Sequence, residues 1–240
     1  MRRYGFSTGA LAKSDFRQGL VLQRQFADAV ELSALRESEL KTIVDALPSL
    51  PLSQFGYVSF HAPSKLAVMS EQAVVETLQR TRGYVHAIIV HPDVIQAPKE
   101  WRSIEDLLVL ENMDQRKPCA RTADEMRGYF EQLPNARFCL DIGHARQVDP
   151  TMGVALELLL AFRDRLAEIH ISEVDADSQH VAISSAAMKA FQRLARLIPD
   201  DIPVIVESVI LTTAIADEIA SARIALQESS IARMSVCVES

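Results

Sequence analysis

The chain has 240 residues, of which 48% are hydrophobic and 24% are charged. This composition is typical of a globular protein, and it excludes a disordered chain, a collagen-like repeat and a coiled coil. The chain holds 25 Lys and Arg residues against 32 Asp and Glu residues, which gives a formal net charge of −7. The balance weighs against an overall basic surface for nucleic acid or an anionic membrane, and it leaves room for local basic loops.

The cysteines and the N-terminal segment are typical of a cytoplasmic protein. Cys119, Cys139 and Cys237 are an odd number without the spacing of metal ligands, so we expect reduced thiols. The N-terminal residues lack the uninterrupted apolar segment of a signal peptide. The longest apolar helical segment, 152–162, is far shorter than the ~20 residues that cross a bilayer. We therefore predict a soluble, cytoplasmic protein with no membrane partner.

Short β-rich segments alternate with segments of helical periodicity along the chain. We expect eight strands, at 4–7, 29–33, 57–60, 87–90, 107–110, 138–140, 168–171 and 204–206. Helical periodicity occurs between them, at 70–82, 122–132, 151–165 and 184–197. This alternation predicts a parallel sheet, and eight repeats without a linker predict a closed barrel. The length is close to the ~250 residues of such a barrel, so we predict one α/β domain over 1–240, a (β/α)8 TIM barrel with short loops.

Ionisable side chains stand at or just after the ends of successive predicted strands. They are His61, His91, Glu111, Asp141, His170 and Glu207, and Glu31 lies within the second strand. Neighbouring members of the series are 20 to 37 residues apart, which fits one strand and one helix for each step. Because the carboxyl ends of barrel strands form one face, we expect these side chains to converge.

Two further histidines turn this series into a candidate metal site. His144 follows Asp141 by three residues, and His180 follows His170 by ten. Five histidines and three carboxylates at one barrel mouth would repel or titrate against one another unless cations hold them. We therefore predict a divalent-metal centre. Of the six histidines, His86 alone falls outside it.

Six fragments of the sequence carry a family resemblance. They are Ser-Phe-His-Ala-Pro (59–63), Val-His-Pro (90–92), Leu-Glu-Asn-Met (110–113), Leu-Asp-Ile-Gly-His-Ala (140–145), Ile-His-Ile-Ser (169–172) and Val-Glu-Ser (206–208). In this order they resemble the xylose isomerase-like TIM-barrel superfamily over nearly the whole chain. That superfamily includes sugar phosphate isomerases and epimerases and the endonuclease IV type of apurinic endonucleases. The fragments are specific for the superfamily and not for one activity within it.

The epimerase branch of this superfamily implies a site with a single ion, commonly Mn²⁺. Its ligand positions look like Glu111, Asp141, His170 and Glu207. The resemblance implies that the two glutamates also transfer protons and that His144 contacts the sugar. The favoured interpretation is therefore a divalent-metal-dependent isomerase or epimerase, which acts on a small sugar, polyol or sugar phosphate by metal-assisted proton transfer.

The endonuclease IV branch implies three zinc ions and is the alternative interpretation. In a multinuclear site His61, His91, His144 and His180 are added to the four ligands above. The ninth ligand position falls near Ser178, where serine is a poor ligand, and Asp175 or Asp177 could replace it only if the loop is rearranged. This alternative predicts a zinc-dependent phosphodiester hydrolase, and only this alternative includes nucleic acid as a partner. A non-catalytic metal-binding barrel is a third interpretation, which the intact carboxylate ligands disfavour.

The loop after Glu111 indicates an anionic substrate. It carries Arg116, Lys117 and Arg121, and Arg146 follows His144 on the same predicted face, so these cations could bind a phosphate or carboxylate. Pairing with Asp114, Asp124 and Glu125 explains the same charges equally well.

Two more expectations concern an acidic residue and the assembly. Glu31 is either a partner of a ligand histidine or a structural carboxylate. Several members of the superfamily form dimers, so the resemblance is also consistent with a homodimer.

Overall fold

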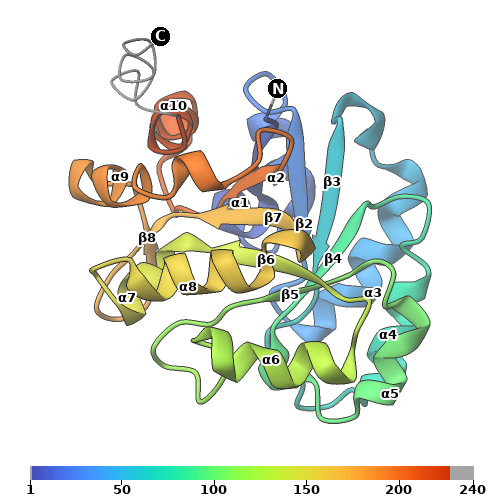
Figure 1. Ribbon diagram of the computed structural model, residues 1–240. Helices are drawn as coiled ribbons and strands as arrows, with labels where there is room; N and C mark the ends of the chain where they lie inside the picture. Colours follow the sequence, from blue (N-terminus) through green and yellow to red (C-terminus); the bar gives the residue numbers. More distant parts are fainter. Residues whose placement is uncertain (1, 228–240) are drawn as a thin grey trace, which may run out of the picture.

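The computed structural model describes residues 2–227 and contains a closed barrel of eight parallel strands (Figure 1). These strands are β1 (Tyr4–Ser7), β2 (Ala29–Ser33), β3 (Tyr57–His61), β4 (Ala87–Val90), β5 (Leu108–Glu111), β6 (Arg137–Asp141), β7 (Leu166–Ile171) and β10 (Val204–Val206). Around the barrel their order is β1-β10-β7-β6-β5-β4-β3-β2, so that the first strand closes against the last. The predicted (β/α)8 barrel is thus confirmed. A separate antiparallel pair consists of β8 (Glu173–Val174) and β9 (His180–Val181).

Helices follow the strands and surround the barrel (Figure 1). They are α1 (Thr8–Ala12), α2 (Phe16–Gln23), α3 (Glu37–Ala46), α4 (Glu71–Gln79), α5 (Pro98–Trp101), α6 (Ala123–Gln132), α7 (Ile142–Val148), α8 (Gly153–Phe162), α9 (Ser185–Phe191) and α10 (Ile215–Ala225). Short 3-10 turns occupy Leu47–Ser49, Leu52–Gln54, Pro92–Val94, Arg102–Ile104, Arg163–Arg165, Ala195–Leu197 and Thr212–Ala214. No helix in the described part of the chain is long and apolar enough to cross a membrane.

The predicted helices are longer than the observed ones. The segment predicted at 184–197 is helical only to Phe191 and ends in a 3-10 turn, and the segment predicted at 151–165 likewise changes to a 3-10 turn after Phe162. The prediction at 70–82 overshoots because a turn follows Gln79, and Gly83 in that turn has a φ of +88°, which glycine adopts without strain. Apolar periodicity continues through the turn after Phe191, at Leu194 and Leu197, so it does not mark the point where that helix stops.

The barrel interior contains its own apolar cluster below the mouth. Its members are Ala29, Tyr57, Ala87, Ile89, Val109, Cys139, Ala167 and Ile205. Alanine at three of these positions leaves room for the Tyr57 ring, which fills the interior and stacks on exposed His86 at a centroid distance of 5.2 Å. Burial raises the pKa of the Cys139 thiol well above its usual value, so Cys139 is a neutral core residue. Cys119 is also a free thiol, and Cys237 lies outside the described residues.

One irregularity in the barrel affects the site. Between β6 and β7, Phe138 pairs with Leu166 whereas Cys139 pairs with Glu168, so β7 contains one extra residue. Such a bulge redirects side chains. Ala167 belongs to the interior cluster, and after the shift Glu168 also has its side chain inside the barrel.

Candidate metal centre

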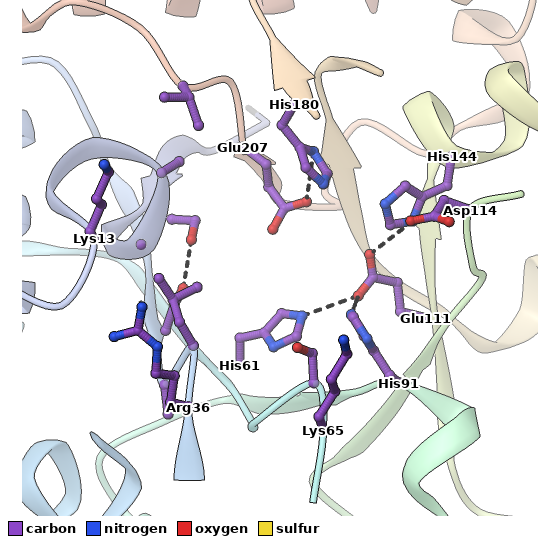
Figure 2. A pocket seen from close by; sticks show the side chains of 18 of the residues that line it. Lys13, Arg36, His61, Lys65, His91, Glu111, Asp114, His144, His180 and Glu207 are labelled. Atoms are coloured by element: carbon purple, nitrogen blue, oxygen red, sulfur yellow. Dashed lines mark hydrogen bonds and ion pairs between the residues drawn. The ribbon is translucent and has the colours of Figure 1, made fainter. Parts of the chain in front are cut away.

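The carboxyl ends of the strands meet at a cavity of about 880 Å³. This volume is within the range of small-molecule sites. The cavity is lined by six of the predicted ligands, which are His61, His91, Glu111, His144, His180 and Glu207. Figure 2 shows His61, His91 and His144 directed at Glu111, with His180 directed at Glu207. The strand ends therefore converge as the sequence predicts.

The first group of candidate ligands consists of His61, His91 and Glu111. Oε2 of Glu111 lies 3.2 Å from Nε2 of His61 and 3.3 Å from Nε2 of His91. Nδ1 of His61 lies 2.7 Å from the carbonyl oxygen of Ala62 and donates its hydrogen there, because a carbonyl can only accept. Nε2 of His61 is then the nitrogen that faces Glu111, and it can serve as a metal ligand once it has lost its proton.

The second group uses the other oxygen of the same carboxylate. Oε1 of Glu111 lies 3.2 Å from Nδ1 of His170, which in turn lies 3.5 Å from Oε2 of Glu207. Together with Asp141, these residues bring four ligand atoms within 4.8 Å of one another. Glu111 is thus shared between two adjoining groups, with one carboxylate oxygen directed at each.

The third group consists of Asp141, His144 and His180, whose ligand atoms also lie within 4.8 Å of one another. Nδ1 of His144 is 3.4 Å from Oδ2 of Asp141. Ser178, at the expected ninth position, has its hydroxyl engaged by Gln147, from whose amide it accepts a hydrogen bond of 2.7 Å. A third group therefore exists without a ligand from that loop, with Asp141 in the second and third groups at once.

The Asp175 carboxylate is engaged inside the same loop. It accepts hydrogen bonds from the backbone N–H groups of Asp177 and Gln179, at 2.9 and 2.8 Å. Within residues 2–227, neither Asp175 nor Asp177 belongs to a group of candidate metal ligands.

Two properties of the donor atoms fit a site for divalent cations: their spacing, and the lack of hydrogen-bond partners at some of them. Ligand bonds of about 2.1 Å in a tetrahedral site place neighbouring ligand atoms about 3.4 Å apart, close to the 3.2–3.5 Å separations around Glu111. In the described part of the chain, Oδ2 of Asp141 and Nδ1 of His91 are buried without a hydrogen-bond partner. Buried polar atoms are rarely left unpaired. The unpaired Asp141 oxygen lies in two of the three groups, where a cation would satisfy it.

The pKa shifts of the candidate ligands also fit a site for cations. Burial opposes the charge on His61, but Glu31 and Glu111 outweigh it and raise the pKa of His61 to about 9. Burial raises the pKa of Asp141 to about 8. Burial also acts to raise the pKa of Glu111, but His170 and its neighbours hold it well below its usual range. Without a cation His61 and Asp141 thus favour their protonated forms, and metal binding displaces such protons.

Comparison with known proteins identifies the fold. No protein-family model matches the chain, and no curated protein matches it in sequence. Among solved structures, an L-ribulose 3-epimerase is 16% identical with a TM-score of 0.64, and the match covers 100% of both chains. Endonuclease IV from Thermus thermophilus is 18% identical with a TM-score of 0.61 over 95% of this chain and 100% of that one. The IolI protein with a bound zinc atom is 12% identical with a TM-score of 0.58, over 93% and 96%.

The chain has the xylose isomerase-like TIM-barrel fold. The resemblance inferred from the six sequence fragments is therefore confirmed at the level of the fold. Because the sequence identities are below one fifth, the structural similarity shows a shared fold and does not by itself show a shared activity.

A buried carboxylate below the mouth of this xylose isomerase-like barrel was not anticipated from the sequence. Oε1 of Glu168 lies 2.8 Å from Nε2 of His170 and accepts a 3.2 Å hydrogen bond from Ser59, while Oε2 accepts a 2.6 Å bond from Tyr57. Oε2 of Glu31 lies 3.2 Å from the same His170 nitrogen. Nε2 of His170 therefore donates, so Nδ1, which faces Glu111, is the nitrogen available to a metal once it has lost its proton. Glu31 therefore lies beside His170, a candidate ligand, which is the first of the two alternatives for this residue.

The alternation of side chains along a strand could have identified Glu168 from the sequence as a neighbour of His170. It precedes His170 by two residues within β7, so both side chains point to the same side of the strand. A fully buried glutamate in an otherwise apolar strand signals a specific partner.

Two of the predicted substrate-binding cations line the cavity, but both are neutralised. Nη2 of Arg116 is 3.0 Å from the carboxylate of Asp114, and Nζ of Lys117 is 2.6 Å from the carboxylate of Asp93. Both acidic partners also line the cavity. These pairs form part of its wall and contribute little net charge.

The other two predicted cations are turned to different partners. Arg121 pairs with Glu125 at 2.8 Å, and Arg146 pairs with Glu173 at 3.0 Å. Neither arginine is among the described residues that line the cavity. The expected anion site therefore does not include Arg121 and Arg146, which pair outside the cavity wall.

Three cations that the sequence did not single out line the cavity instead. Lys13 follows α1, Arg36 precedes α3, and Lys65 lies in the loop after β3. They come from the connections after the first three strands of the xylose isomerase-like barrel. The basic side of the cavity therefore differs from the one that the loop after Glu111 predicted.

Proposed function

We propose that this chain is a divalent-metal-dependent hydrolase of phosphoesters that binds more than one cation. The observation that carries the proposal is the position of Glu111, whose two carboxylate oxygens face two separate groups of candidate ligands. A carboxylate that bridges two cations is a common way to hold a pair of metals close together in phosphoester hydrolases. The neighbouring group of Asp141, His144 and His180 extends the same arrangement.

The proposed ligands are the eight residues His61, His91, Glu111, Asp141, His144, His170, His180 and Glu207. Zn²⁺ is the proposed metal for a site so rich in imidazole. Divalent cations bound there supply Lewis-acid stabilisation of the charge that develops on phosphate oxygens.

The chain's own residues bind and orient the substrate in this proposal. The Glu207 side chain is 14% exposed and lines the cavity. Burial opposes its ionisation, but His170 and His180 outweigh burial and keep the pKa of Glu207 below its usual value. Glu207 therefore stays a carboxylate that can accept a hydrogen bond from the attacking water and orient it. Lys65 brings a positive charge to the same cavity, where it attracts the phosphate.

A mononuclear isomerase or epimerase is the second candidate, which the sequence favoured. The supporting observation is that Glu111, Asp141, His170 and Glu207 form a complete four-ligand group without the other histidines. Glu111 and Glu207 lie on either side of Nδ1 of His170, at 3.2 and 3.5 Å, and are therefore suitably placed for a pair of proton-transferring carboxylates. Mn²⁺ is the expected ion in this case, with His144 at the substrate.

Hydrolysis of bis(p-nitrophenyl) phosphate by the zinc-loaded protein tests the first candidate. We expect turnover in the wild type and a loss of at least about 100-fold in the double variant His61→Ala/His91→Ala, because that variant removes the first donor group. His86→Ala is the matched histidine control, since exposed His86 lies outside the three groups, and it should retain full activity.

The same preparation also tests the second candidate. The protein is incubated with a panel of ketoses and aldoses in D2O. Deuterium incorporation next to the carbonyl, without hydrolysis of the phosphodiester, would overturn the hydrolase and support the isomerase.

A further inference from the structure

The cavity has two sides of different chemistry. Figure 2 shows Lys13 and Arg36 on one side of His61, whereas Glu111 and His91 lie on the other. Lys65 lines the same cavity. The candidate metal ligands therefore occupy only part of the cavity, and a second set of cations faces them across it.

The cations of the second set are less fully paired than Arg116 and Lys117. Among residues 2–227, Lys13 forms no ion pair, and its charge is free to attract an anion. Arg36 has one acidic neighbour, Glu39, at 3.6 Å, and its side chain is 75% exposed. In a protein with a net charge of −7, cations that line a cavity concentrate positive potential there.

The backbone of Lys13 supports a functional role for its side chain. Its φ is 52° and its ψ is −122°, a conformation that costs a residue with a side chain on the order of 1–3 kcal/mol. Its N–H bonds the carbonyl of Gly9 at 3.0 Å and ends α1 at this point. Glycine would adopt the same turn without strain. Strained residues of this kind cluster at ligand sites, and Lys13 lies at the wall of a cavity.

Apolar side chains lie on the cavity wall as well. Leu35 and Val209 are large hydrophobic residues with exposed fractions of 45% and 59%, and both line the cavity. Ala10 and Ala34 line it too. Exposed apolar side chains gathered in a cavity are typical of a surface that contacts the hydrocarbon part of a ligand.

We propose that Lys13 and Arg36 bind a second phosphate of the substrate, which is not the phosphate that reacts at the Glu111 side. The substrate class is a small organic compound with two phosphates, whose connecting carbon skeleton contacts Leu35 and Val209. This inference rests on the proposed function for the place of the reacting phosphate. Arginine and lysine recognise phosphate through charge-assisted hydrogen bonds, and Lys65 remains available beside the metal ligands.

Binding of alkane bisphosphonates tests the proposal without turnover. Isothermal titration calorimetry on the zinc-loaded protein compares bisphosphonates of three to six carbons with the monophosphonate of each chain length. We expect the best bisphosphonate to bind about tenfold more tightly than its monophosphonate, because it gains charge-assisted hydrogen bonds. The double variant Lys13→Gln/Arg36→Gln should lose this advantage and keep its affinity for the monophosphonate.

Lys99→Gln removes an exposed lysine that does not line the cavity, and it should keep the full bisphosphonate advantage. A wild type that binds every bisphosphonate no more tightly than its monophosphonate would overturn the proposal, as would an advantage that survives in the double variant. Because phosphonate C–P bonds are not hydrolysed by phosphoesterases, this result is independent of the phosphodiester assay. Failure of the hydrolase proposal would appear in that assay alone.

Discussion

Two layers of side chains fill the same barrel, and different forces hold them. The lower layer is the apolar cluster around Tyr57 and Ile205, which is stabilised by burial and close packing. The upper layer consists of the eight candidate ligands at the mouth, where buried carboxylates and imidazoles are only partly satisfied by one another. At the end of the last strand the two layers are two residues apart, with Ile205 in β10 and Glu207 directly after it.

This difference separates stability from function within the fold. The lower layer lowers the free energy of the folded chain without any ligand. The upper layer is costly, because buried charges must be paired or neutralised. Its arrangement becomes favourable when cations take up the free lone pairs. Substitutions in the two layers should therefore act on different measurements.

The largest effect is expected at Glu111. Glu111→Gln keeps the shape of the side chain but removes the charge shared by two ligand groups. We expect the variant to lose most of its bound metal and at least about 1,000-fold of its phosphodiester activity, which corresponds to about 4 kcal/mol. Metal analysis by mass spectrometry and the hydrolysis assay measure both losses. Glu157→Gln on the exposed face of α8 is the matched control, and equal metal content in the two variants would contradict the bridging role.

In the lower layer, Ile205→Ala should affect stability and leave the metal in place. Ile205 is fully buried, and truncation of such a residue typically costs about 2–5 kcal/mol. Urea unfolding of the metal-free protein measures this loss. The metal content of the folded variant should equal that of the wild type. Loss of metal without loss of stability would contradict the division into two layers.

Glu168 joins the two layers, so its replacement should give a smaller and mixed effect. Glu168→Gln weakens the hydrogen bond that orients His170, and loss of such a partner lowers metal affinity by about 10–100-fold. Competition with a fluorescent zinc chelator measures the affinity. Tyr57→Phe removes the hydrogen bond to the other oxygen of Glu168 and should lower the affinity less. If both variants bind zinc as tightly as the wild type, Glu168 does not position the histidine.

The smallest effect is a gain in stability at Lys13. Lys13→Gly should relieve the strained backbone and stabilise the metal-free protein by about 1 kcal/mol, provided that relief of strain exceeds the added freedom of the unfolded chain. Lys13→Ala retains the strain and should not stabilise. Urea unfolding compares the three proteins, and an equal effect of glycine and alanine would show that the backbone is not strained. Both variants should lose the bisphosphonate advantage.

The barrel and its ligand-bearing mouth could be predicted because both depend on local patterns. An apolar run followed by a polar residue marks the end of a buried strand, and His61, His91 and Glu111 each lie at such an end. In a parallel barrel all strand ends meet, so the convergence follows from the fold class. Helix ends were less predictable, since apolar residues continue into the 3-10 turn that follows Phe191.

The basic side of the cavity could not be predicted from the sequence because it depends on side-chain partners. Arg121 and Arg146 lie in suitable loops, but Glu125 and Glu173 hold them away from the cavity. Lys13 lines the cavity through an unusual backbone conformation that no local propensity predicts for lysine. Pairing and loop conformation are set by tertiary contacts, which periodicity does not report.

Metal stoichiometry of the natively purified protein tests the central claim most directly. The shared position of Glu111 predicts two or more divalent ions per chain in the wild type. It also predicts that His61→Ala/His91→Ala loses one equivalent and keeps the ions held by the remaining ligands. One ion per chain in the wild type, or the same stoichiometry in the double variant, would contradict a multinuclear centre.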